Sequence, residues 1–207
     1  FYLFIMILAS LPFSIFLIHG IIRSLNDLII RFQIRSNTTN NIYIFSLCWL
    51  ISVFLFFSFS STKLPSYWIP AIPAASILIS RSAEILNIKN RKISVIWLLT
   101  TLIIFGISLA FYFSDSWLIL IDDPEMPDLV NQIKINGLIF RARILFTLLT
   151  IISIFFIFKF SRKSLIFMQL LLFGGQFFLM PQIRNLADNL RQLPIRNISK
   201  KIIKVRS

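Results

Sequence analysis

The stretch that decides the fold reads SSTKLPSYWIPAIP (residues 60–73) and lies between two long apolar runs. It holds one lysine, Lys63, and three prolines, Pro65, Pro70 and Pro73. A lysine at the centre of a bilayer costs about 3 kcal/mol, and each proline removes a backbone donor that lipid cannot replace. We therefore expect this turn to lie at a membrane face or to line a polar cavity, while the flanking runs enter the membrane.

The composition is that of an integral membrane protein. Hydrophobic residues make up 57% of the 207 residues, and the mean hydropathy is +0.84. A soluble domain of this size could not cover so much apolar surface. The net charge of +13 would suggest nucleic acid in a soluble protein, but here the basic residues separate apolar runs. Membrane orientation and anionic lipid headgroups explain them, so we expect membrane lipids and no nucleic acid as partners.

Six apolar stretches approach the roughly 20 residues that a helix needs to cross a bilayer. They are continuously apolar, which excludes the alternating pattern of a transmembrane barrel. The sequence therefore predicts an all-α, polytopic transmembrane helix bundle of about six spans, with the third and the fifth short. The stretches are residues 2–22, 42–59, 66–80, 93–113, 144–158 and 164–180.

The charges of the loops predict the orientation. The loops after the first, third and fifth stretches are rich in arginine and lysine, which places them in the cytoplasm. The turn at Lys63 and the loop 114–143, with five of the eight acidic residues, then face outward. We expect residues 1–181 to form the bundle and residues 182–207 to form a basic, amphipathic outer tail that could begin a soluble domain. Its seven basic residues would favour the cytoplasm, but long domains translocate largely regardless of charge.

That tail has apolar residues at helical spacing, which predicts an amphipathic helix that ends at Pro194. The helix would lie on a membrane surface or pack on a further domain. The apolar residues are Ile183, Leu186, Leu190 and Leu193.

Few other residues suggest chemistry. His19 is the only histidine and no catalytic motif accompanies it, so we interpret it as a packing residue. The single cysteine, Cys48, excludes an internal disulfide and a CxxC site. Residues 122–128 could bind a hard cation through carboxylates, although two prolines favour a solvated turn. We predict no metal ligands and no cofactor, and we leave a need for a divalent metal open. Gly174 and Gly175 indicate a close helix approach.

Lys63 and Tyr67 are the candidate binding residues. Four positions apart across Pro65, they offer an ammonium and a phenol where a lipid phosphate would lie. A phosphate at headgroup depth needs a neutralising charge and hydrogen-bond donors. Pro65, Trp68 and Pro70 would shape the site. The alternative is an ordinary interfacial anchor without a ligand.

Residues 59–70, FSSTKLPSYWIP, resemble the lysine-leucine-proline-x-tyrosine-x-x-proline signature of the aminoarabinose transferase and protein mannosyltransferase-like family, with Ser66 where threonine is frequent. Members of that family are GT-C glycosyltransferases, which move a sugar from a polyprenyl phosphate to an acceptor on the outer face of the membrane. The resemblance implies an enzyme of the bacterial inner membrane, with a lipid-phosphate contact from Lys63 and Tyr67.

The same resemblance implies that the catalytic carboxylates lie in the first outer loop, near the N-terminus of such proteins. This chain opens at Phe1 inside an apolar stretch. We therefore expect it to be a C-terminal half that works with a missing N-terminal half. The alternatives are a multipass lipid or solute transporter or flippase, in which the helix broken by prolines lines the path, and a structural membrane subunit.

Overall fold

The computed structural model describes residues 1–34, 41–61, 64–85, 91–121, 128–158 and 162–192, and every regular element among them is helical. These residues confirm the all-α membrane class. Four helices are long and apolar enough to cross a membrane, or five if one bent pair counts as a single span, where about six were expected. The chain divides into two compact units, and each is described by itself.

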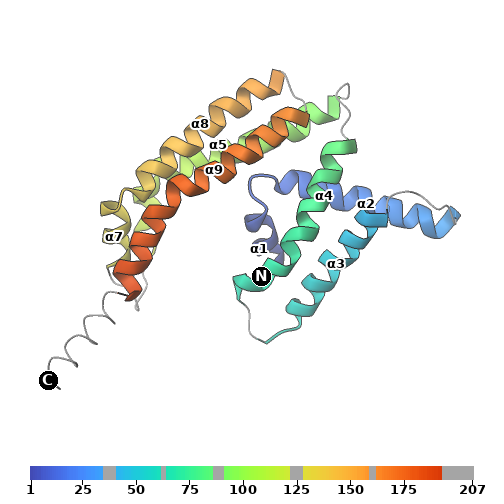
Figure 1. Ribbon diagram of the computed structural model, residues 1–207, viewed down its shortest axis with the longest axis horizontal. Helices are drawn as coiled ribbons and strands as arrows, with labels where there is room; N and C mark the ends of the chain where they lie inside the picture. Colours follow the sequence, from blue (N-terminus) through green and yellow to red (C-terminus); the bar gives the residue numbers. More distant parts are fainter. Residues whose placement is uncertain (35–40, 62–63, 86–90, 122–127, 159–161, 193–207) are drawn as a thin grey trace. The chain divides into compact units, whose positions relative to one another are not determined.

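The first unit comprises Phe1–Ile103 and Phe156–Leu165 (Figure 1). Within it α3 and α4 pack side by side, and α2 crosses both of them. Its core is formed by small and apolar side chains of α2, α3, α4 and the short helix η1. The elements are α1 (Tyr2–Ala9), α2 (Ser14–Ile34), α3 (Asn41–Ser58), the 3₁₀ helix η1 (Pro65–Ala71), α4 (Ile72–Ile85) and the first part of α5 (Arg91–Tyr112).

The first apolar stretch is not one straight span. Helix α1 ends at Ala9, and α2 leaves it at an angle of 115° after a break that contains Pro12 in a cis peptide bond. Proline has no N–H to donate, which favours a helix end at this point. Helix α2 then continues to Ile34, well beyond the expected limit at residue 22.

The third stretch is short, as expected. Helix α4 has 14 residues and so covers about 21 Å, less than the roughly 30 Å of a bilayer core. The seven residues of η1 precede it and include Pro65 and Pro70. These prolines keep the segment before α4 out of regular α-helix, because each removes a backbone donor.

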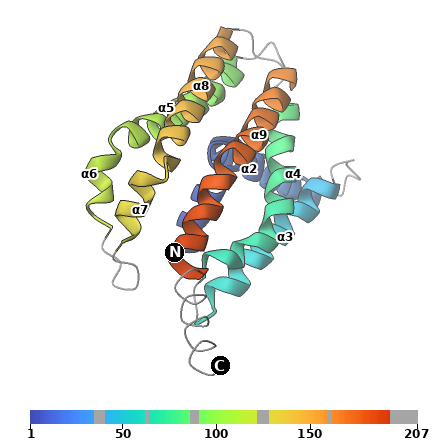
Figure 2. The ribbon, with the colours of Figure 1, turned by 60° about the vertical axis from the view of Figure 1, so that its left-hand side comes forward.

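The second unit comprises Ile104–Phe155 and Ile166–Ser207. In it the later part of α5 lies beside α8, and α8 lies beside α9, with the short helices α6 and α7 at one end (Figure 2). Gly175 of α9 faces the side chain of Leu145 on α8, so the close approach predicted there is confirmed, whereas Gly174 faces open space. The further elements are α6 (Ser114–Leu118), α7 (Leu129–Ile135), α8 (Leu138–Phe158), α9 (Arg162–Ala187) and the π-helical turn η2 (Asp188–Gln192).

The limits of the last two spans differ from those expected. Helix α8 has 21 residues and begins at Leu138, before Arg141 and Arg143, so the fifth span is not short. The two arginines do not end the helix, because each donates to a backbone carbonyl of a neighbouring helix. Helix α9 runs through Pro181 to Ala187, and Arg141 Nη1 donates to the carbonyl of Phe178, close to the position where the proline lacks its donor.

Candidate functional site

The described residues of the turn, 60–61 and 64–73, follow the end of α3 and lead through η1 into α4. Leu64 is extended, with φ −105° and ψ 138°, and Pro65 then opens η1. A proline suits this position, because its missing N–H would have no partner in the first helical turn and its φ is already fixed. The backbone N–H of Tyr67 donates to the carbonyl of Leu64 at 3.2 Å. Pro65 and this hydrogen bond therefore fix the backbone of Tyr67 in the first turn of η1.

Tyr67 lies against the last turn of α3. Its ring stacks on that of Phe57, with centroids 4.8 Å apart and planes 24° from parallel. The two rings line an open cavity of about 530 Å³ together with Phe56, Phe59 and Ser60. Its lining combines aromatic faces with a phenol and a hydroxyl, which suits an amphiphile with one polar end.

Trp68 lies in the core of the first unit. Its side chain is 4% exposed and packs with Leu47, Ala71 and Leu78. A buried indole of this size fixes η1 against α3 and α4. Pro70 lies inside η1 and is exposed. Lys63, which the sequence makes the principal candidate, lies outside the described residues, while its described neighbours Ser61 and Leu64 are exposed.

A polar cluster lies between α2 and α4. His19 Nδ1 is 2.8 Å from Ser82 Oγ, and Arg23 Nε donates to His19 Nε2 at 3.3 Å. One turn after Arg23 on α2, Asp27 forms an ion pair with Arg81 of α4, with 3.0 Å between Oδ2 and Nη2. His19 thus ties two helices together, in agreement with the packing role expected for it.

Arg81 is held from two sides. Its guanidinium carbon lies 4.4 Å from the centre of the Tyr43 ring, which provides a cation–π contact in addition to the pair with Asp27. Sequence reasoning assigned Arg81 to a cytoplasmic loop and missed the pair. The sequence signal for this pair is weak: Asp27 follows the first apolar stretch, and Arg81, of opposite charge, follows the third.

The close crossing of α2 and α4 depends on Gly20. A Cβ at this position would overlap the backbone carbonyl of Leu78, so only glycine fits. Small residues allow this approach in membrane helices, where packing and polar contacts replace the hydrophobic effect. The sequence does not predict this close crossing, because Gly20 has no second glycine at GxxxG spacing.

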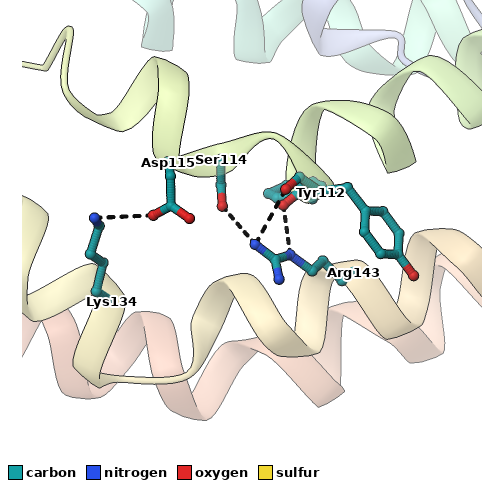
Figure 3. A network of polar contacts seen from close by, with 6 residues as sticks. Tyr112, Ser114, Asp115, Lys134 and Arg143 are labelled. Carbon is teal, nitrogen blue, oxygen red and sulfur yellow. Dashed lines mark hydrogen bonds and ion pairs between the residues drawn. The ribbon is translucent and has the colours of Figure 1, made fainter.

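A second polar network lies in the second unit (Figure 3). Arg143 Nε donates to the carbonyl of Phe111 at 2.7 Å, and Nη2 donates to Ser114 Oγ at 2.9 Å. Nearby, Lys134 pairs with Asp115 at 3.0 Å. Sequence reasoning treated Arg143 only as the limit of a loop and missed this arrangement.

The acidic loop gives no metal site among the described residues. Residues 122–127 lie outside them, and the rest of the described chain holds no cluster of three histidine, cysteine or acidic side chains suited to a metal. The predicted tail is described as far as Gln192, where helix continues from α9 through η2, so Leu193 falls outside. Cys48 is an exposed free thiol.

Fold and site together define a polytopic, all-α integral membrane protein with an aromatic, proline-rich turn beside an open cavity. A stretch of 92 residues, 44% of this chain, is 37% identical to the undecaprenyl phosphate-alpha-4-amino-4-deoxy-L-arabinose arabinosyl transferase of Wigglesworthia glossinidia brevipalpis. That match confirms the resemblance to an aminoarabinose transferase, and the chain spans only 15% of the relative's length. No family model matches the chain, and no solved structure matches it.

Proposed function

We propose that this chain is part of a membrane glycosyltransferase that transfers a sugar from a polyprenyl-phosphate donor to a lipid, glycan or protein acceptor. The observation that carries the proposal is the 37% identity to an arabinosyl transferase whose name specifies an undecaprenyl phosphate sugar. The signature at residues 63–70 supports it, because it supplies a cation and a phenol four positions apart.

In this proposal Lys63 and Tyr67 act on the leaving phosphate. When the acceptor hydroxyl attacks the anomeric carbon, the bond to the phosphate oxygen breaks and negative charge collects on that oxygen. An ammonium neutralises this charge and a phenol donates a hydrogen bond to it, a contribution of about 3 kcal/mol for each preorganised donor. The carboxylate that deprotonates the acceptor would come from the loop that the family resemblance assigns to the N-terminal half.

The cavity beside Tyr67 supports a binding role for the first isoprene units. Phe56, Phe57 and Phe59 present aromatic surface at the end of α3, and Phe59 is 88% exposed. An isoprenoid chain there would gain van der Waals contacts with these rings, which drive association when a chain leaves lipid rather than water. The stacking of Tyr67 on Phe57 holds the phenol ring beside this aromatic surface.

We further propose that the turn 60–73 faces outward from the bacterial inner membrane. The basic loops on the other side of the membrane support this orientation. In the same scheme residues 1–181 form the bundle and residues 182–207 begin an outer tail.

The proposal is tested by transfer of radiolabelled sugar from a polyprenyl phosphate in membranes that contain the complete protein. Lys63→Ala should lower the rate at least about tenfold, because the lost charge stabilisation exceeds about 1.4 kcal/mol. Tyr67→Phe should lower it less. Transfer by Lys63→Ala at the parental rate would leave the turn as a lipid anchor only.

Lys134→Ala provides the matched control. This lysine also lies in the predicted outward-facing part of the chain, and its partner Asp115 has a side chain that is 76% exposed. An exposed pair of this kind contributes less than about 1 kcal/mol, so the variant should transfer sugar at close to the parental rate. Equal losses in both lysine variants would mean that the effect of Lys63→Ala is not specific.

A transporter or flippase is the second candidate. The observation that favours it is the charged and polar cluster between α2 and α4, because ionisable groups within membrane helices mark transport paths. Transfer of sugar to an acceptor on one side of the membrane, without movement of the donor lipid across it, would favour the glycosyltransferase. Movement of labelled lipid without transfer would favour the transporter.

A further inference from the structure

The end of α5 carries an arginine site that the proposed function does not use. Arg143 reaches from α8 to the last turn of α5, where helical carbonyls have no partner within the helix. The guanidinium makes bonds through Nε and Nη2 to Phe111, Ser114 and, at 3.5 Å, the carbonyl of Tyr112. These contacts hold the planar group in one orientation (Figure 3).

The role of a helix cap does not account for all of this arrangement. Within the described part of the chain, Nη1 of Arg143 makes no hydrogen bond. Arg143 also lines a cavity of about 320 Å³ with Tyr112, Phe140 and Thr147. The hydroxyls of Tyr112 and Thr147 lie 3.4 Å apart in that lining. A fixed cation and two hydroxyls therefore border one hollow.

The charge at this cavity favours an anion. None of its lining residues is acidic. Asp115, which is close by in the chain, is paired with Lys134 at 3.0 Å. A guanidinium binds phosphate through directed hydrogen bonds and does not lose its charge at neutral pH.

The apolar side of the cavity continues along α8. Ile144 and Leu148 belong to the lining, and Ile151 and Phe155 follow at helical spacing on the same face. Their side chains are 38%, 53%, 60% and 60% exposed, in that order. An acyl chain could lie along this row while its headgroup contacts Arg143.

We infer that the Arg143 cavity binds a phospholipid with a singly charged phosphodiester headgroup, of the phosphatidylglycerol class. One guanidinium balances the single charge of a phosphodiester. The sugar-linked polyprenyl phosphate is also a diester, but the proposed function assigns it to the turn 60–73, where the signature supplies Lys63 and Tyr67. Basic pockets between membrane helices hold anionic headgroups in the same way. The inference is independent of the proposed glycosyl transfer, because it rests on the second unit alone.

The test is retention of dioleoylphosphatidylglycerol by the purified chain, measured as bound lipid by native mass spectrometry from detergent micelles. Arg143→Gln should weaken retention at least about tenfold, because a charge-assisted hydrogen bond is lost. Arg141→Gln is the matched control, since Arg141 lies on the same helix and donates to the carbonyl of Phe178. It should change retention less than about twofold. Parental retention by Arg143→Gln would overturn the inference.

Leu148→Trp keeps the test decisive if Arg143→Gln does not fold. Leu148 is 53% exposed, so a larger side chain can be accommodated, and the indole would fill the cavity while the bonds of Arg143 remain. The variant should lose the lipid and keep its helical circular dichroism. Unchanged retention would overturn the inference, as would displacement of the lipid by millimolar inorganic phosphate or equal retention of uncharged dioleoylglycerol.

Discussion

Gly20→Ala offers a sharp test of the packing in the first unit. The added methyl group would overlap the carbonyl of Leu78, so α2 and α4 must separate. Overpacking of this kind costs about 1–3 kcal/mol, and the upper end applies here because the obstacle is backbone. Separation also lengthens the 2.8 Å contact of His19 with Ser82, which contributes about 1 kcal/mol. Against this, alanine gains about 1 kcal/mol of helix propensity. The net loss is about 3 kcal/mol.

The measurement is reversible unfolding of the chain in mixed micelles by increasing fractions of sodium dodecyl sulfate, followed by tryptophan fluorescence. Trp68 and Trp97 are 4% and 0% exposed, so both report on the first unit. Gly106→Ala is the control, because a Cβ at Gly106 meets nothing within 4 Å. Gly20→Ala should unfold at a lower detergent fraction than the parent, and Gly106→Ala at the same or a higher one. If the two variants unfold together, the close crossing of α2 and α4 is wrong.

Three further predictions concern charge, topology and activity. Asp27→Asn should destabilise the first unit by about 2 kcal/mol in the same unfolding assay, because the mostly buried guanidinium of Arg81 loses its charged partner. Asp115→Asn, in an exposed pair, should cost less than about 0.5 kcal/mol, and equal losses would contradict this reasoning. In a Cys48→Ser background, an impermeant thiol reagent should label Ser61→Cys and not Asn90→Cys in intact cells; the reverse would invert the topology. The 207-residue chain alone should insert but transfer no sugar, because the family resemblance places the catalytic carboxylates in an N-terminal loop; robust transfer would show that one of the chain's own carboxylates acts as the base.

Much of the helical organisation could be predicted from the sequence. The second and fourth stretches coincide with α3 and α5 to within two residues at each end. Both are continuously apolar and end at polar residues, so hydropathy alone defines them. The shortness of α4 also follows from the prolines before it.

The remaining features depend on contacts between distant residues. The sequence predicts that the loop before the fifth span ends at Arg143, but Arg143 lies within α8, because the carbonyl of Phe111 accepts a hydrogen bond from it. The bend before α2 and the fit of Gly20 against Leu78 likewise depend on neighbours that no local pattern names. At the candidate site the sequence identified Tyr67, whereas the stacking on Phe57 and the cavity came from the structure.

The central claim is that the turn 60–73 holds the phosphate end of a polyprenyl donor. The most direct measurement is photocrosslinking of an undecaprenyl phosphate that carries a diazirine on the isoprene nearest the phosphate, followed by mapping of the labelled peptide. We predict labelling within residues 56–67, where Phe56, Phe57, Phe59, Ser60 and Tyr67 line the cavity, and competition by unlabelled undecaprenyl phosphate but not by undecaprenol. Labelling confined to the lining of the Arg143 cavity, or equal competition by undecaprenol, would contradict the claim.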